Sequence, residues 1–277
     1  MEIGITPANL ATYRERGYWI SPKLIDNAQI SRLRKAMERM FAGDYDGDGC
    51  SYDNESEEMA KDPHALRKLT NGWWINDEVR ALVLGPELGR VAAALMEVGR
   101  VRLWHDQVVW KPPTLGGDDA NAGNVGWHQD YAYWNCTDST NMLTAWLALQ
   151  DTDLDNGGMR TLVGSHACGL VEEADTFYEQ DLDALADRFA GRVKERWIDE
   201  PCILRAGQVS FHHPLCFHGS GPNKTNAPRL SVIAHYMPDG CAYKAGRRYH
   251  RNMRFLGPRP RDGQPFDDDT YFPLAET

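Results

Sequence analysis

Apolar residues recur at helical spacing in the first hundred residues of the chain. In the segment NAQISRLRKAMERMF, residues 27–41, they fall on one stripe, which is typical of an amphipathic helix. A second helix is predicted at about 86–98, where a proline opens the run PELGRVAAALMEV. A third should follow Thr6 and Pro7, which are typical of an N-cap and a first helical turn. We expect residues 1–100 to form a helical layer.

From residue 101 onward the apolar positions come in short or alternating runs. The predicted strands begin near residues 101, 124, 142, 159, 202, 208 and 229. Clusters of Gly, Pro, Asn and Asp separate the runs, which is the pattern of an antiparallel barrel or sandwich. We expect an α+β fold in a single domain, 1–277, with a β core at about 101–240 behind the helical layer.

Two segments depart from this strand pattern. Residues 170–200 are charged and partly helical, as in an insertion that lies over one mouth of a barrel. Residues 241–277 carry many arginines, then three aspartates, with Pro and Gly between them. We interpret this C-terminal tail as a solvated segment that packs on the surface, rather than as a substrate gate.

Charge and hydropathy exclude several partners. The 40 acidic residues outnumber the 30 basic ones and give a net charge of -10, whereas binding to a nucleic-acid backbone needs basic patches. No apolar run approaches the ~18 residues of a membrane span, and the start of the chain lacks a signal-peptide pattern. The six cysteines show no CxxC spacing, so we expect free thiols. We expect a cytoplasmic protein without nucleic-acid or membrane partners.

A histidine and an aspartate lie two positions apart in His128-Gln129-Asp130. On a strand, residues i and i+2 project from the same face, so one imidazole and one carboxylate would point together into the barrel. The pair alone is weak, because a His-x-acid spacing arises readily by chance. Two histidines and one carboxylate, however, hold Fe(II) on one face and leave positions open for substrate and oxygen.

The third ligand is best sought in FHHPLCFHGSGPNKTNAPRLSVIAHYM. There His218 precedes a turn rich in Gly, Pro and Asn, and a hairpin would bring Arg229 back beside it. Arginine binds a carboxylate through two hydrogen bonds, and Ser220 adds a hydroxyl on the same strand face as His218. His212 and His213 lack an arginine at a comparable offset, and we set them aside as core or surface histidines.

Together these segments resemble the phytanoyl-CoA dioxygenase family. The likeness covers about residues 8–240 and is carried by WHQDYAYW, LTAWLAL, DNGG followed by GSH, and HGSGPN with an arginine eleven residues after its histidine. The resemblance implies a double-stranded β-helix core (a jelly-roll, cupin-like fold). It also implies an enzyme that uses Fe(II), 2-oxoglutarate and O2.

The resemblance also implies roles for individual residues. Iron would be bound by His128, Asp130 and His218. The distal carboxylate of 2-oxoglutarate would be bound by Arg229 and Ser220, and the cosubstrate pocket would also be lined by Trp146 and Gln107. Substrate would contact Tyr133 and Trp134. The alternatives are core packing for these aromatic residues and a strand-to-strand contact for the glutamine.

The predicted function is therefore a 2-oxoglutarate-dependent dioxygenase. We expect it to hydroxylate a small-molecule metabolite with release of succinate and CO2. Halogenases of this kind have Gly or Ala where this chain has Asp130, so hydroxylation is favoured. One alternative is a zinc-dependent hydrolase or isomerase on a cupin-like barrel, which would not need Arg229. Another is a catalytically silent metabolite-binding protein. A small free metabolite is favoured over a CoA thioester, and no oligomeric state is predicted.

Residues 44–55 match the pattern of a calcium-binding loop. The pattern uses Asp44, Asp46, Asp48, Gly49 and Glu55. Ser51 replaces the usual aliphatic residue, and there is no second loop to pair with. We therefore favour an acidic solvated loop over a calcium site.

Overall fold

The computed structural model describes residues 4–46, 66–114, 121, 123–193 and 197–277. Its strands form two antiparallel sheets. The six-stranded sheet has the order β1-β8-β5-β10-β3-β2, with β1 (Tyr18–Ile20), β2 (Arg67–Thr70), β3 (Val101–Lys111), β5 (Leu143–Ala148), β8 (Val209–His212) and β10 (Arg229–Pro238). The four-stranded sheet has the order β4-β9-β6-β7, with β4 (Val125–His128), β6 (Met159–Leu162), β7 (Asp199–Pro201) and β9 (His218–Ser220).

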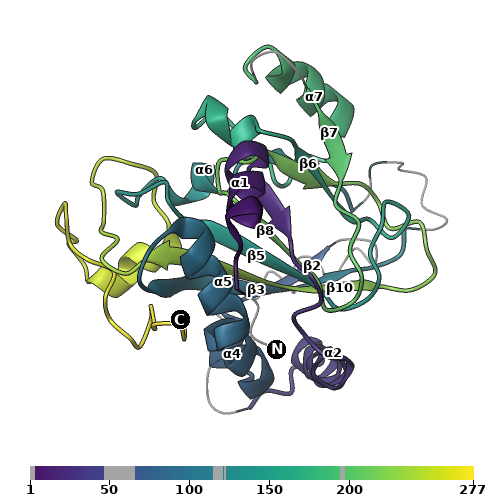
Figure 1. The fold of residues 1–277 in the computed structure, drawn as a ribbon, viewed down its shortest axis with the longest axis horizontal. Helices are drawn as coiled ribbons and strands as arrows, with labels where there is room; N and C mark the ends of the chain where they lie inside the picture. Colours follow the sequence, from purple (N-terminus) through teal and green to yellow (C-terminus); the bar gives the residue numbers. More distant parts are fainter. Residues whose placement is uncertain (1–3, 47–65, 115–120, 122, 194–196) are drawn as a thin grey trace.

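The helices gather mainly on one face of the larger sheet (Figure 1). They are α1 (Pro7–Arg16), α2 (Asn27–Phe41), α4 (Asp77–Leu84) and α5 (Pro86–Met96), followed by α6 (Tyr131–Trp134) and α7 (Leu182–Ala190) farther along the chain. Short 3-10 turns are η1 (Gly72–Trp74), η2 (Ser165–Cys168) and η3 (Arg251–Leu256). The expected helical layer is confirmed, although the first hundred residues also supply β1, β2 and α4, which the pattern did not predict.

Local sequence sets the helix ends as expected. The Thr6 side chain accepts a hydrogen bond from the backbone N–H of Asn9 at the start of α1, and Asp26 does the same for Gln29 at the start of α2. The stripe predicted on α2 is buried: it consists of Ile30, Leu33, Met37 and Met40. Burial of this stripe against the sheet holds α2 in place.

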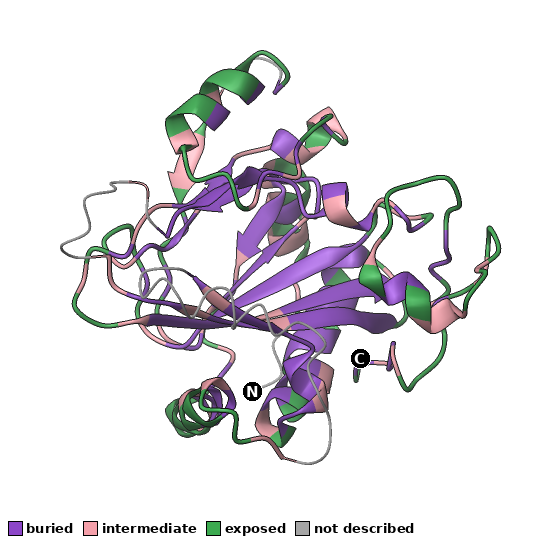
Figure 2. Cartoon of the chain, turned by 180° about the vertical axis from the view of Figure 1, so that it is seen from behind, coloured by how far each residue is buried: buried purple, intermediate pink, exposed green. Residues whose placement is uncertain are grey.

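Alternation along the strands gives the larger sheet two different faces. In β10, Leu230, Val232 and Ala234 join the core under the helices. The alternate residues Arg229, Ile233 and His235 line a cavity on the opposite face. The four-stranded sheet closes that cavity from the other side, and Figure 2 shows the buried strands between exposed outer surfaces of α2 and α7. This is the double-stranded β-helix that the sequence predicts.

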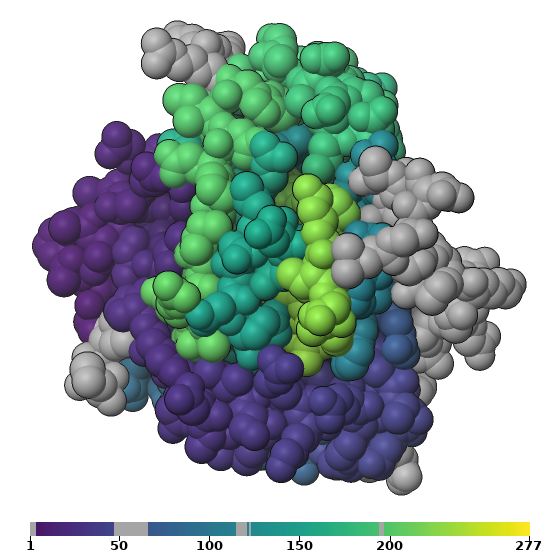
Figure 3. Space-filling model, turned by 90° about the vertical axis from the view of Figure 1, so that its right-hand side faces the viewer, coloured from purple at the N-terminus to yellow at the C-terminus, as the bar shows by residue number. Residues whose placement is uncertain are grey.

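The insertion lies over the four-stranded sheet. Its helix α7 buries Leu185 and Phe189 in a small core of their own with Trp127 of β4. In the space-filling view this segment and α2 lie at opposite ends of the molecule (Figure 3). The expected position over one end of the β core agrees with this arrangement.

The C-terminal tail is a correction to the sequence analysis. Residues 241–277 do not form a purely solvated segment, because Phe266 and Phe272 are fully buried against Trp104 of β3. These rings anchor the tail, and residues 248–251 then line a cavity. Charged residues dominate this part of the sequence, so its pattern did not reveal the few aromatic residues that anchor the tail.

The segment that matches the calcium-loop pattern, predicted to be an acidic solvated loop, lies largely outside the described residues, which include neither Asp48, Gly49 nor Glu55. Asp44 and Asp46 are described, and both form ion pairs with Arg39. Elsewhere, five described cysteines carry free thiols. No helix within the described ranges has the length and apolar character needed to cross a membrane.

Candidate active site

Strand pairing brings two of the predicted ligands together. His128 ends β4, His218 begins β9, and the two residues are direct cross-strand partners. Their ring centroids lie 4.2 Å apart. Asp130 follows two residues after His128, and within the described residues these three side chains form a group whose ligand atoms all lie within 4.8 Å of one another. All three side chains are buried.

The aspartate does not lie on a strand, which corrects the sequence analysis. β4 ends at His128, and Asp130 has helical torsions (φ -56°, ψ -40°) at the start of α6. The Gln129 amide causes this bend: it donates to the carbonyls of Gly169 and Leu215 and accepts from the N–H of Val171. The chain therefore turns at Gln129, and Asp130 still faces His128.

The hydrogen bonds of both histidines fix the ring nitrogen available to a metal. Nδ1 of His128 lies 2.7 Å from the carbonyl of Gly126, and Nδ1 of His218 lies 3.0 Å from that of Cys216. A carbonyl only accepts, so each Nδ1 carries the proton and each Nε2 presents a lone pair. The two Nε2 atoms lie 3.6 and 3.8 Å from Oδ1 of Asp130. This donor set suits a divalent transition metal.

Burial and neighbouring charges set the protonation of His218 and Asp130, and a metal requires a neutral imidazole and an ionised carboxylate. Burial lowers the pKa of His218 well below its ordinary value, which keeps the imidazole neutral. Burial by itself would raise the pKa of Asp130, but its contacts with His218, His128 and His212 outweigh burial and hold the pKa well below its ordinary value. The neutral imidazole of His218 and the carboxylate of Asp130 therefore meet beside His128.

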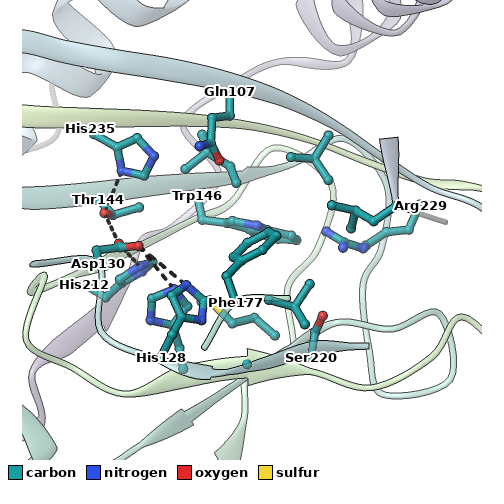
Figure 4. Close-up of a pocket in the computed structure, with 17 residues that line it drawn as sticks. Gln107, His128, Asp130, Thr144, Trp146, Phe177, His212, Ser220, Arg229 and His235 are labelled. Carbon is teal, nitrogen blue, oxygen red and sulfur yellow. Dashed lines mark hydrogen bonds and ion pairs between the residues drawn. The ribbon is translucent and has the colours of Figure 1, made fainter. Parts of the chain in front are cut away.

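The second carboxylate oxygen of Asp130 is held from the larger sheet. The Thr144 hydroxyl donates to Oδ2 at 2.7 Å, and Nδ1 of His235 lies 2.9 Å from the same hydroxyl (Figure 4). His212, which the sequence analysis sets aside, is buried in β8 with Nε2 3.5 Å from Oδ2. His213 lies elsewhere, and its Nδ1 accepts from the backbone of Leu215.

A small cavity of about 70 Å³ leads from this cluster to a buried arginine. Figure 4 shows Arg229 and Ser220 at one end of the cavity and the His–Asp cluster at the other. The Arg229 guanidinium lies 5.0 Å from the ring of Trp146, and burial lowers its pKa to about 10. No carboxylate in the described residues forms an ion pair with Arg229. A buried cation of this kind suits a bound anion.

Arg229 and His218 do not share a hairpin, which is a second correction. β9 belongs to the four-stranded sheet and β10 to the six-stranded sheet, so residues 221–228 cross between the sheets. Asn223 holds this crossing, because its amide donates to the carbonyls of Lys111 and Ala227. Ser220 and Arg229 therefore face the cavity from opposite walls.

Comparison with known proteins identifies the family of the chain. The family model for phytanoyl-CoA dioxygenase (PhyH) matches residues 13–231. The chain belongs to the phytanoyl-CoA dioxygenase family. One relative is the ectoine dioxygenase of Streptomyces avermitilis, 25% identical over 267 residues, which cover 92% of this chain and 86% of that protein. Another is the peroxisomal phytanoyl-CoA dioxygenase of Bos taurus, 23% identical over 241 residues, with coverages of 83% and 68%.

Solved structures with the same fold include enzymes of nogalamycin biosynthesis. The non-haem α-ketoglutarate-dependent carbocyclase SnoK is 23% identical, with a TM-score of 0.74 and coverages of 98% of this chain and 97% of that chain. The epimerase SnoN is 25% identical, with a TM-score of 0.72 and coverages of 98% and 98%. As a member of the phytanoyl-CoA dioxygenase family, the chain is a 2-oxoglutarate-dependent non-haem iron dioxygenase that acts on a small molecule.

One residue of this dioxygenase escaped the sequence analysis. Lys111 ends β3 directly opposite Arg229 in the strand register and is fully buried. Its Nζ donates to Oγ of Ser220 at 2.6 Å and also to the carbonyl of Gly221. Burial and the neighbouring Arg229 lower its pKa well below the ordinary value. Arg229 lies opposite Lys111 because of the register between β3 and β10, and a single sequence does not reveal that register.

The other predicted residues lie around a second, larger cavity of about 380 Å³. Gln107 lines both cavities, as do His128, Asp130, Phe177 and His235. Tyr133 and Trp134 line only the larger one. Phe177 comes from the insertion, and its backbone N–H donates to the Tyr133 hydroxyl. Residues 248–251 of the tail complete the wall, so two segments that sequence analysis placed outside the core also shape this cavity.

Proposed function

We propose that the chain hydroxylates a small molecule at iron held by His128, Asp130 and His218. The observation that carries this proposal is the meeting of three potential ligand atoms where two cavities join. Bound iron, together with 2-oxoglutarate and O2, supplies an oxidation that inserts oxygen into a substrate C–H bond and yields succinate and CO2. Hydroxylation is supported by a relative named L-proline trans-4-hydroxylase, from Streptomyces griseoviridis, which is 25% identical over 238 residues.

In this proposal the small cavity binds 2-oxoglutarate. The buried Arg229 pairs with the distal carboxylate, and this charge-assisted contact fixes the long axis of the cosubstrate. Ser220 donates its hydroxyl proton to the same carboxylate, because its oxygen already accepts from Lys111. Trp146 packs beside the guanidinium, and Gln107 faces the cosubstrate from β3.

The larger cavity then binds the substrate. It shares the wall formed by His128 and Asp130 with the small cavity, so a molecule bound there lies against the metal ligands. Tyr133 and Trp134 give this cavity an aromatic lining. A volume of about 380 Å³ lies within the range of small-molecule sites and favours a free metabolite over an entire CoA thioester.

The test is an anaerobic titration of the purified protein with Fe(II) and 2-oxoglutarate. The chelate should give a weak visible charge-transfer band, and His218→Ala should abolish both the band and succinate formation while the protein stays folded by circular dichroism. The control is His213→Ala, which alters a histidine outside both cavities and should keep the band.

Three results would contradict the proposal. A band of normal intensity in His218→Ala would remove that residue from the metal site. Activity with zinc and without 2-oxoglutarate would favour the hydrolase alternative. Absence of the band in the wild type, with zinc also inactive, would favour a silent binding protein.

A further inference from the structure

Two buried histidines line the larger cavity and have unused hydrogen-bonding atoms. His105 of β3 and His235 of β10 are direct cross-strand partners, with ring centroids 4.4 Å apart. Each is less than 5% exposed, at 4% and 3%. Nδ1 of His105 and Nε2 of His235 have no hydrogen-bond partner among the described residues. A buried polar atom without a partner is costly, so both atoms point to a ligand.

The contacts of Thr144 fix the tautomer of His235. The Thr144 hydroxyl has one proton and donates it to the Asp130 carboxylate, which only accepts when ionised. The Thr144 oxygen must therefore accept from His235, so Nδ1 of His235 carries the proton. Nε2 of His235 is then a lone pair on the cavity wall, and only a donor can satisfy it.

His105 complements this acceptor. Burial, with the neighbouring His235 and His250, lowers the pKa of His105 well below its ordinary value, so the ring is neutral. A neutral imidazole carries one N–H and one lone pair. With its proton on Nδ1, the atom without a partner, His105 is a donor beside the acceptor of His235.

We infer that the substrate of this dioxygenase is an alcohol whose hydroxyl group binds between His105 and His235. The hydroxyl donates to Nε2 of His235 and accepts from His105, so a single group satisfies both rings. The rest of the molecule is an apolar or aromatic body that contacts Trp134 and Phe177. This inference rests on the proposed function, since it takes the larger cavity as the substrate site.

Other polar groups fit this position less well. A carboxylate has no proton for the lone pair of His235. An ammonium group could donate, and the wall includes the Asp130 carboxylate, but Lys68 and Arg251 of the same wall would repel it. Trp134 packs edge-on against both imidazoles, with centroids 4.7 Å from His235 and 5.8 Å from His105, which adds an apolar surface beside them. A neutral hydroxyl is therefore favoured over a charged group.

The test compares three probes that share one carbon skeleton. Protein loaded with zinc and 2-oxoglutarate is titrated with 1-tetralol, which donates and accepts, 1-tetralone, which only accepts, and tetralin, which does neither. We expect 1-tetralol to bind at least about tenfold more tightly than either of the other two, because only it has a donor for His235. Stronger binding of the matching carboxylate, 1,2,3,4-tetrahydro-1-naphthoic acid, would overturn the inference, and so would failure of 1-tetralol to bind.

Variants assign the preference to the two rings. His105→Phe and His235→Phe should each remove the preference for the alcohol, whereas His213→Phe should retain it. A preference that survives in both cavity variants would overturn the inference. Nitrogen NMR of the zinc-loaded protein adds a direct readout: the non-protonated Nε2 resonance of His235 should shift on binding 1-tetralol and stay unchanged with tetralin.

The anaerobic chelate band keeps the two proposals distinct. If Fe(II) and 2-oxoglutarate give the band and 1-tetralol shows no preference, the inference about the alcohol fails and the proposed function stands. If the band is absent in the wild type, the proposed function fails. His105→Phe should keep the band, which would show that the metal site survives this substitution.

Discussion

The Thr144 hydroxyl donates to Oδ2 of Asp130 at 2.7 Å, from the sheet opposite His128 and His218, the two histidines proposed as metal ligands. This contact ties the carboxylate to β5, although Asp130 itself lies on a turn. Oδ1 is left facing Nε2 of His128 and His218. A residue outside the ligand group thus sets the orientation of its carboxylate.

Removal of the Thr144 hydroxyl should weaken metal binding. We expect Thr144→Val to lower the affinity for Fe(II) or zinc by about 10–100-fold, because the carboxylate loses the bond that orients it. Competition with a chelating indicator measures this affinity. Thr144→Ser keeps the hydroxyl and should retain most of it; equal affinities in Thr144→Val and wild type would rule out this positioning role.

Lys111 should matter for the cosubstrate. We expect Lys111→Met to raise the KM for 2-oxoglutarate at least about tenfold, because Ser220 loses the donor that directs its own hydroxyl proton toward the cosubstrate. The kcat at saturating 2-oxoglutarate should change less, and Lys111→Arg should recover part of the loss. The measurement is succinate release over a range of 2-oxoglutarate concentrations. A lower Fe(II) affinity with an unchanged KM would contradict this role.

The lack of a side chain at Gly126 should be necessary for residues 176–179 to pack over the site. A Cβ at this position would overlap the carbonyl oxygens of Thr176 and Glu179, both backbone atoms. We expect Gly126→Ala to displace residues 176–179, and Phe177 with them, so that substrate turnover falls while the 2-oxoglutarate chelate still forms. Hydrogen exchange should rise in this segment. Gly99→Ala, where a Cβ meets nothing within 4 Å, is the matched control and should behave as wild type.

Asp106 should give the protein a distinctive pH dependence of stability. This carboxyl is fully buried and accepts from the N–H groups of Gly72 and Trp73 at 3.0 and 3.1 Å. Burial nevertheless raises its pKa from 3.8 to about 7. Between these two values the folded state holds a proton that the unfolded state has lost, so stability falls as the pH rises.

Urea unfolding of wild type and Asp106→Asn tests this dependence. The Asn variant lacks the titration, so from about pH 4 to about pH 7 the wild type should lose up to about 4 kcal/mol relative to it. The test is how the difference in unfolding free energy between wild type and Asp106→Asn changes with pH. The size of that difference at a single pH is not informative, because the Asn amide also alters the contacts at any pH. A difference that stays constant over this range would show that Asp106 is ionised in the folded protein.

Helices and ligand residues were the most predictable parts of this chain. The stripe on α2 and the cap at Thr6 depend on neighbours a few residues away, and both lie where the pattern placed them. His128 and Asp130 are also neighbours in sequence, so their convergence was predicted correctly, although Asp130 lies beyond the strand that was expected to carry both. The bend at Gln129 depends on backbone groups about forty or more residues away.

The remaining parts of the site depend on contacts between distant strands. His212 lines the small cavity and Lys111 contacts Ser220 in its wall only because of the strand register, which no local pattern encodes. The hairpin expected at Arg229 failed for the same reason: the sequence shows a turn, but not which sheet each arm joins. The tail was misjudged because two buried rings anchor it among many charged residues.

The C-terminal tail bears on how members of this family come to differ in substrate selectivity. The family model ends at residue 231, whereas residues 248–251 form part of the wall of the larger cavity. Arg248 also forms an ion pair with Asp175 of the insertion, so the two segments join above the site. Replacement of the tail by that of another family member would therefore exchange the selectivity of the enzyme while the oxidising machinery is inherited intact.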